Sequence, residues 1–402
     1  MVTIEDIKDA KRRLDGIVRE TPMAFAPILS KKNGAHIYLK KENLQLTGSF
    51  KLRGAFNKIS KLSESERAKG VVAASAGNHA QGVAYSAKHF MCEATIIMPA
   101  ATPLTKINGV KALGADVVLH GANYDEAYKY AIDYAKENNK TFVHPYAEDD
   151  VIAGQGTITL EIFETLDKQI DIMIIPIGGG GLITGIATSA RALNPKIKIV
   201  GVVASGARAM KESFEARKPI DSISVRTIAD GIAVRDTTPK MVDYVLDLVD
   251  EVIEVEDNEI ASAILFLLEK HKLVVEGAGA TGVAALMHNK IDVTEKTVVV
   301  PLSGGNIDVT MLAQIIEKGL VKSSRKMNLI VTLIDRPGSL KQLTQIFEDL
   351  AANIVQIDYD RNSVQLDFGD ANVTIALETK GSEHQQEIRD SLTKAGYRFK
   401  QL

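Results

Sequence analysis

A lysine that could act as a nucleophile stands at position 51. It follows a short polar turn, Thr47-Gly48-Ser49-Phe50, and precedes an apolar pattern of helical spacing from Leu52 to Ile59. Ser49 is a residue type that caps helices, so Lys51 is predicted to lie in the first helical turn. Burial and the helix dipole would both disfavour the ammonium form and lower the pKa of Lys51. Such an amine can attack a carbonyl group; a solvated lysine at a helix start is the alternative interpretation.

Four consecutive glycines could bind an anion. Gly178, Gly179, Gly180 and Gly181 follow a strongly apolar predicted strand, residues 170 to 177, and precede a predicted helix. Backbone N–H groups without neighbouring Cβ atoms can close around a phosphate, and the helix N-terminus adds its dipole. The segment does not follow the G-x-G-x-x-G pattern, which disfavours a nicotinamide cofactor.

Two further polar loops follow apolar predicted strands. In Ser75-Ala76-Gly77-Asn78-His79 the backbone N–H groups could bind a carboxylate, although His79 is also typical of a packing residue at a helix start. In Ser303-Gly304-Gly305-Asn306 the serine hydroxyl could face a ligand or simply complete a turn at the strand end.

In order and rough spacing, these loops resemble those of the pyridoxal-phosphate (PLP) enzymes of the tryptophan-synthase-β fold. The forms SFKLRGA, SAGNHAQG, GGGGL and LSGGN are most similar to threonine dehydratases, or threonine ammonia-lyases. The resemblance covers about residues 1 to 320. It implies an α/β, two-lobed, parallel-sheet catalytic unit of PLP fold type II.

The resemblance also implies roles for the candidate residues. Lys51 would hold PLP covalently and remove the substrate's α-proton, with Phe50 beside it. Ser303 would face the pyridine nitrogen, where a hydroxyl stabilises a positive charge less well than a carboxylate and so favours β-elimination. Asn78 would bind the ring hydroxyl of the cofactor. The cofactor phosphate would be bound by Gly178, Gly179, Gly180, Gly181 and Leu182. The substrate carboxylate would be bound by Ser75, Ala76, Gly77, Asn78 and His79.

Two departures distinguish this chain from serine racemases of the same family. Those enzymes place a second serine where this chain has Ala76, so a two-sided proton relay is not expected. Eukaryotic racemases also carry metal-binding carboxylates after the strand that corresponds to residues 197 to 203. The segment Val203 to Ala209 has no Asp or Glu, so we expect no divalent metal there.

The expected activity is therefore deamination of L-threonine to 2-oxobutanoate and ammonia, with L-serine as a further substrate. Such an activity belongs to amino-acid metabolism, for example isoleucine biosynthesis. Two alternatives stay open: serine racemase or serine dehydratase on the same fold, and a non-catalytic regulator that binds PLP or an amino acid.

Composition limits the other classes of function. The chain has 402 residues, a formal net charge of −3 and one cysteine, Cys92. We expect no nucleic-acid partner, because no basic stripe with interleaved aromatics is present. No apolar run approaches the ~20 residues of a membrane span. Without a signal-peptide pattern, and with a single cysteine, the expected location is the cytoplasm.

The alternation of strands and helices from about residue 70 to 144 predicts parallel sheets. We expect a catalytic unit over residues 1–321, with a smaller lobe of about residues 47–150 inserted in a larger one. Residues 322–326 are polar and predict a linker. Residues 327–402 predict the order βαββαβ, that of a ferredoxin-like fold.

This C-terminal segment resembles an ACT domain, the small-molecule sensor of many amino-acid enzymes. The resemblance implies an amino-acid effector, and a module used only for oligomerisation is the alternative. A homodimer or homotetramer is the family expectation. The candidate effector residues are Asp335, Pro337, Gly338, Ser339, Leu340 and Asn353.

Overall fold

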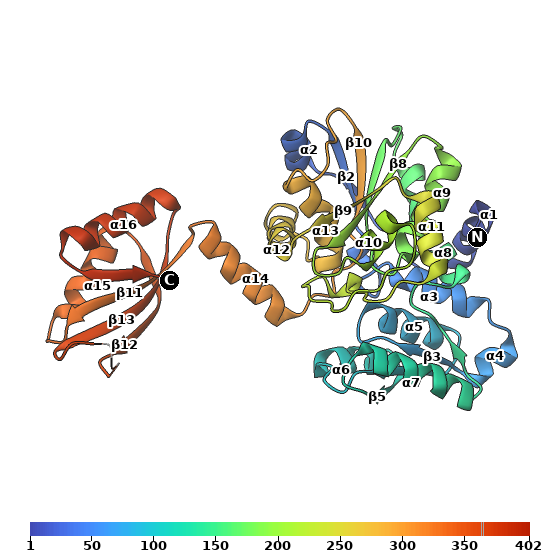
Figure 1. Ribbon diagram of the computed structural model, residues 1–402, viewed down its shortest axis with the longest axis horizontal. Coiled ribbons are helices and arrows are strands. Elements are labelled where there is room, and N and C mark those ends of the chain that lie inside the picture. The colour runs from blue at the N-terminus through green and yellow to red at the C-terminus, as the bar shows by residue number, and fades with distance from the viewer. Residues whose placement is uncertain (363, 365) are drawn as a thin grey trace. The chain divides into compact units, whose positions relative to one another are not determined.

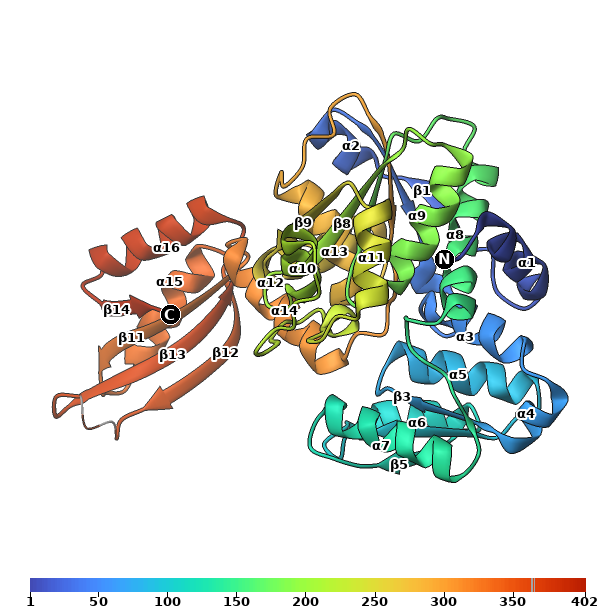
Figure 2. The ribbon, with the colours of Figure 1, turned by 45° about the vertical axis from the view of Figure 1, so that its right-hand side comes forward.

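A computed structural model describes residues 1–362, 364 and 366–402 of the chain. It divides the chain into two compact units, Met1–Ile307 and Asp308–Leu402. Figures 1 and 2 show both units, and each is described here by itself.

The N-terminal unit contains a larger, six-stranded sheet. Its strand order is β1-β2-β10-β7-β8-β9, and all neighbours pair in parallel except the edge strand β1. The central strands are buried along their whole length, as expected for a parallel sheet that is covered on both faces. The strands are β1 (Met23–Phe25), β2 (His36–Lys40), β7 (Ile172–Pro176), β8 (Lys198–Ala204), β9 (Glu251–Val255) and β10 (Thr297–Pro301).

A smaller, four-stranded sheet forms a second lobe of the same unit, and Figure 2 shows it with its helices below the larger sheet. Its order is β5-β4-β3-β6 and every pair is parallel. The predicted parallel sheets are thus confirmed. The strands are β3 (Val71–Ala74), β4 (Ala94–Met98), β5 (Asp116–Leu119) and β6 (Thr141–Phe142).

Helices connect these strands and cover the sheets. The α-helices of the N-terminal unit are α1 (Ile4–Leu14), α2 (Pro27–Asn33), α3 (Lys51–Ser60), α4 (Glu64–Lys69), α5 (Asn78–His89), α6 (Leu104–Ala112), α7 (Tyr124–Glu137), α8 (Asp149–Thr165), α9 (Gly181–Leu193), α10 (Ala209–Ala216), α11 (Pro239–Leu248), α12 (Asp257–Phe266) and α13 (Gly277–Met287). Short 3₁₀ turns are η1 (Glu42–Leu44) and η2 (Asp230–Ile232), and η3 (Leu267–His271) is a π-helical turn.

The starts of two helices differ in how they are capped. Thr3 and Asp6 form a capping box at the start of α1. The prediction that Ser49 caps α3 was wrong, because the residue before this helix is Phe50, which has no side-chain cap. Ser49 instead pairs through its backbone with Gly304. Its fully buried side chain therefore lies one residue too early to cap the helix.

The C-terminal unit has the predicted βαββαβ order after an initial helix, α14 (Val309–Lys322). Its sheet is antiparallel with the order β12-β13-β11-β14. One face packs on two helices around Leu343, Phe347 and Ile388. The elements are β11 (Lys326–Ile334), α15 (Ser339–Asp349), β12 (Asn353–Asp360), β13 (Asp370–Glu378), α16 (Ser382–Lys394) and β14 (Arg398–Gln401).

A bilayer-spanning helix would need about 20 apolar residues. Within the described part of the chain, no helix is both long and apolar enough to cross a membrane.

Candidate active site

A cavity of about 700 Å³ lies in the N-terminal unit and is lined by loops from both lobes. The loops after β3, β7 and β10 all reach it, as expected at the carboxyl ends of parallel strands. Every catalytic, cofactor and carboxylate candidate of this unit lines the cavity: Phe50, Lys51, Ser75, Ala76, Gly77, Asn78, His79, Gly178, Gly179, Gly180, Gly181, Leu182 and Ser303.

Lys51 is the first residue of α3 and is only partly exposed, towards this cavity. Its Nζ donates to the backbone carbonyl of Pro145 at 2.8 Å. Burial lowers the pKa of Lys51 to about 8, although the nearby Glu276 acts in the opposite direction. The amine is therefore far easier to deprotonate than an ordinary lysine, as a nucleophile or base requires.

The glycine loop forms a close-fitting cradle at the start of α9. An ideal Cβ on Gly179 would lie 2.6 Å from ring atoms of Tyr146, and one on Gly181 would lie 2.7 Å from the Tyr146 carbonyl oxygen. Gly180 has a φ of 93°, in the left-handed region that favours glycine. Side chains at Gly179 and Gly181 would clash with Tyr146, so the loop lines the cavity with bare backbone. The cradle therefore fits a phosphate group such as that of PLP.

A chain of amides joins three of the loops around the cavity. Asn78 donates from Nδ2 to Glu276 Oε1 and Oε2 at 2.8 and 3.0 Å. Asn306 donates from Nδ2 to Asn78 Oδ1 at 2.7 Å and to the carbonyl of Thr47 at 2.8 Å. The chain fixes the orientation of the Asn78 amide relative to the lysine turn.

Glu276 lines the cavity and is 3% exposed. Burial raises the pKa of Glu276 to about 7, and the charge of Asp230 adds to this effect. The carboxyl group can therefore gain or lose a proton near neutral pH. Sequence reasoning missed this residue, because a glutamate before a small-residue helix has no motif. The apolar pair Val274-Val275 just before it was the one available sign that it would be buried.

Two imidazoles near Lys51 are held neutral. Burial, and then the charge of Lys51, lower the pKa of His79 to about 3 and that of His144 to about 4. His79 is buried at the start of α5, and its Nε2 lies 2.9 Å from the carbonyl of Val143. His144 accepts the N–H groups of Tyr146 and Ala147 through Nδ1. Both rings thus pack and orient loops.

Ser303 is buried and lies on the side of the cavity formed by the larger sheet. Its carbonyl accepts the N–H of Phe50 at 3.0 Å, next to the backbone bridge between Ser49 and Gly304. These contacts place the serine beside the residue before Lys51.

The candidate effector residues all lie in the C-terminal unit, but they do not form one cluster within it. Asp335 accepts the hydroxyl of Tyr359 at 2.9 Å, and Ser339 is buried at the start of α15. Asn353 lies opposite Glu378 of β13, and Glu378 lies opposite Lys326, the first residue of β11. Asp335 follows the other end of β11. At about 3.3 Å per residue, Asn353 and Asp335 are roughly 30 Å apart along the sheet.

This two-lobed fold and its lysine-and-glycine cavity define the class of protein. Residues 14–304 match the family of pyridoxal-phosphate dependent enzymes, and the chain belongs to that family. The predicted family, fold and cofactor are confirmed.

Individual relatives indicate the kind of enzyme within this family. The chain is 47% identical over 397 residues to an L-threonine ammonia-lyase of Thermotoga maritima, covering 99% of this chain and 98% of that protein. It is 45% identical to an L-threonine ammonia-lyase of Geobacter sulfurreducens, covering 97% of each. Among solved structures it resembles processed threonine deaminase isoform 2 of Solanum lycopersicum, with a TM-score of 0.74, 37% identity, and 78% and 87% of the two chains covered. Maize serine racemase gives a TM-score of 0.74 and 34% identity over 80% of this chain and 98% of that one.

Proposed function

We propose that this protein deaminates L-threonine to 2-oxobutanoate and ammonia, and that it also accepts L-serine. The observation that carries the proposal is the partly buried Lys51, of lowered pKa, in one cavity with a glycine cradle for phosphate. Near-full-length similarity to two proteins named L-threonine ammonia-lyase supports the choice of substrate.

The residues around the cavity suit PLP. The loop from Gly178 to Leu182 would hold its phosphate, Asn78 would face its ring hydroxyl, and Ser303 its ring nitrogen. When bound, PLP supplies the electron sink for loss of the α-proton and the β-hydroxyl.

The protein's own groups position the substrate and move its proton. The N-terminus of α5 and the loop from Ser75 to His79 offer N–H groups for the amino acid's carboxylate. Because its pKa is about 8, Lys51 is neutral in about half of the protein molecules at pH 8, and it takes the α-proton at Nζ. Asn78, held by Glu276 and Asn306, keeps its amide at a fixed angle to the cavity.

Racemisation is the second candidate, because the chain also resembles maize serine racemase. Ala76 argues against it, since a methyl group cannot carry a proton to the face opposite Lys51. The yield of D-serine from L-serine separates the two functions.

The decisive experiment is keto-acid release from L-threonine, with L-serine in parallel, by PLP-loaded protein. We expect 2-oxobutanoate from the wild type and none from Lys51→Ala, whose circular dichroism should match the wild type. Normal turnover by Lys51→Ala would refute the assignment. A PLP-bound wild type that releases no keto acid from either substrate would refute the lyase function.

Regulation is proposed for the C-terminal unit. A branched-chain amino acid would bind near Asp335, Pro337, Gly338, Ser339 and Leu340, and a second copy of the unit would supply Asn353, which lies too far away within one copy. This arrangement agrees with a homodimer or homotetramer in the cytoplasm. Calorimetry of the full chain with isoleucine and valine tests it, and absence of heat with both would contradict it.

A further inference from the structure

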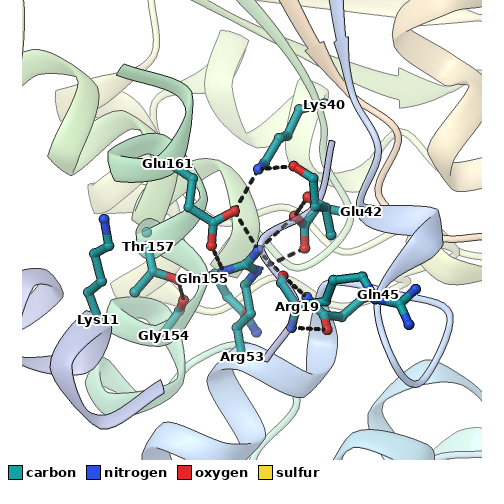
Figure 3. Close-up of polar contacts among 12 residues, drawn as sticks. Lys11, Arg19, Lys40, Glu42, Gln45, Arg53, Gly154, Gln155, Thr157 and Glu161 are labelled. Carbon is teal, nitrogen blue, oxygen red and sulfur yellow. Dashed lines mark hydrogen bonds and ion pairs between the residues drawn. The ribbon is translucent and has the colours of Figure 1, made fainter. Parts of the chain in front are cut away.

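Four charged side chains form a buried cluster behind the lysine turn, and Figure 3 shows their contacts. Lys40, Glu42 and Arg53 are 1%, 0% and 0% exposed, and Glu161 is 6% exposed. The cluster contains two positive and two negative groups, so it is neutral overall. None of the four lines the cavity of the active site.

Arg53 is the centre of the cluster. Its Nε and Nη2 donate to Glu42 Oε2 and Oε1 at 2.8 and 2.9 Å. Its Nη1 and Nη2 donate to Glu161 Oε1 and Oε2 at 2.5 and 2.9 Å. One planar guanidinium therefore makes paired hydrogen bonds to two carboxylates at once, a bidentate geometry that the ammonium group of a lysine cannot reproduce.

Lys40 closes the cluster on its other side. Its Nζ donates to Glu161 Oε2 at 2.5 Å and to the carbonyl of Thr21 at 2.6 Å. The hydroxyl of Thr21 in turn donates to Glu42. The four charges thus join β2, η1, α3 and α8.

The cluster is arranged around the lysine turn. Glu42 comes before the turn and Arg53 after it, so their double hydrogen bond closes the segment that carries Lys51 into a loop. Residues two apart lie on nearly opposite faces of a helix. When Arg53 is fixed against η1 and α8, Lys51 on the other side of α3 must face the cavity.

Helix α8 adds a second restraint at the same level. Gln155 accepts the N–H of Gly54 through Oε1 at 3.1 Å, and the backbones of Gly54 and Gly154 lie so close that a Cβ on Gly154 would be 2.6 Å from Gly54 Cα. Gln155 also lines the cavity. The contact therefore fixes the position of α3 along α8, three residues from Lys51.

Stability alone is a poor reason to keep such a cluster. Well-packed apolar side chains of similar volume often replace buried ion pairs without loss of stability. The hydrogen bonds of Arg53 to Glu42 and Glu161 are directional, so they can instead fix how η1, α3 and α8 lie against one another. We propose that Arg53, through Glu42 and Glu161, is a positioning residue. It fixes α3 so that the amine of Lys51 lies where it can react with the cofactor.

The test compares Arg53→Lys with Asn57→Ala as a matched control. Asn57 also makes a buried polar contact between α3 and α8, because its Nδ2 donates to the carbonyl of Asp150 at 2.7 Å. It lies more than a turn further from Lys51. Both variants weaken the contact between α3 and α8, but only Arg53→Lys should displace Lys51.

Two readouts are taken for each variant. The first is the rate at which cofactor-free protein binds PLP covalently at Lys51. Borohydride reduction makes this bond permanent, and the mass of the labelled peptide identifies the lysine. This readout does not depend on threonine turnover. The second is kcat and KM for L-threonine. Since a misplacement of about 1 Å can cost roughly 100-fold in rate, we expect Arg53→Lys to lose 10- to 100-fold in capture rate and in kcat, with little change in KM.

Asn57→Ala should melt at a lower temperature yet retain both rates. The proposal is overturned if Arg53→Lys captures PLP at the wild-type rate, or if Asn57→Ala loses as much as Arg53→Lys. Glu161→Gln preserves the shape and is measured if Arg53→Lys does not fold, with the same expected loss. Failure of both to fold would assign the cluster to stability and also overturn the proposal.

Discussion

The side-chain amide of Asn78 donates two hydrogen bonds to one carboxyl group, that of Glu276, at 2.8 and 3.0 Å. The two residues come from different lobes, because Asn78 follows β3 and Glu276 precedes α13. The pair therefore couples the orientation of an amide in the cavity to the protonation state of a buried acid.

The first prediction concerns Glu276→Gln in the cofactor-free protein. Between its ordinary pKa of 4.5 and its folded value of about 7, Glu276 binds more protons in the folded than in the unfolded state. It contributes stability below the ordinary pKa, and that contribution is lost as the pH rises through 7. The free energy of unfolding of the wild type should therefore fall by roughly 2–3 kcal/mol more than that of the variant when the pH is raised from 5 to 8. Chemical denaturation at both pH values measures this difference, and an equal fall in both proteins would contradict it.

The second prediction concerns the reactivity of Lys51. In cofactor-free protein, an amine of pKa about 8 should be modified with a pH midpoint near 8, whereas exposed lysines react with midpoints near 10.4. Competitive acetylation followed by peptide mass spectrometry measures both in one sample. Because Glu276 raises the pKa of Lys51, Glu276→Gln should lower the midpoint further. A Lys51 midpoint equal to that of exposed lysines would contradict the prediction.

The third prediction concerns the glycine cradle. Gly179→Ala would place a methyl group 2.6 Å from the ring of Tyr146 and force the ring or the loop to move. We expect PLP affinity to fall about tenfold or more, which corresponds to about 1.4 kcal/mol. Gly109→Ala is the control, since its new Cβ would meet no atom within 4 Å. Titration of cofactor-free protein with PLP compares the two, and equal affinities would contradict the steric explanation.

The fourth prediction concerns two ion pairs that join the lobes beside the cavity. Lys106 lies 3.2 Å from Asp230, and Arg235 lies 2.8 Å from Asp125. All four residues line the cavity, and their side chains are partly exposed to solvent. Exposed pairs are weak and screened by salt.

Replacing Lys106 and Arg235 together by Met should therefore raise KM for L-threonine by only a few-fold. The difference from the wild type should shrink as the salt concentration is raised. Steady-state kinetics at low and high salt test this, and an effect that does not depend on salt would mean that the pairs act through packing.

The architecture followed from local patterns in the sequence. Strands such as β7 and β10 are continuous apolar runs, and each is followed by a glycine-containing loop that the structure places at the cavity. Lys51 and the four glycines could be placed because strand–loop–helix spacing fixes where their backbones lie. The βαββαβ order of the C-terminal unit followed from alternating apolar residues.

Contacts between distant segments could not be predicted in this way. Glu276 meets Asn78, and Glu161 meets Arg53, only because the fold brings separate elements together. Apolar residues adjoin both glutamates in the sequence, Val275 before Glu276 and Leu160 before Glu161, but they do not identify the partner that each carboxylate meets. Ser49 shows the same limit, since a distant backbone bridge to Gly304 outweighed its local tendency to cap a helix.

Strand β10 lies in the middle of the larger sheet, between β2 and β7. It is nevertheless the last strand of that sheet to leave the ribosome. At 5–20 residues per second, the nascent chain waits roughly 6–25 s between the end of β7 and the start of β10. During that time β2 and β7 each present an apolar edge that can pair with another chain. Newly made protein is thus most vulnerable to aggregation just before Thr297 to Pro301 emerge, and a chaperone that covers these edges would act in that interval.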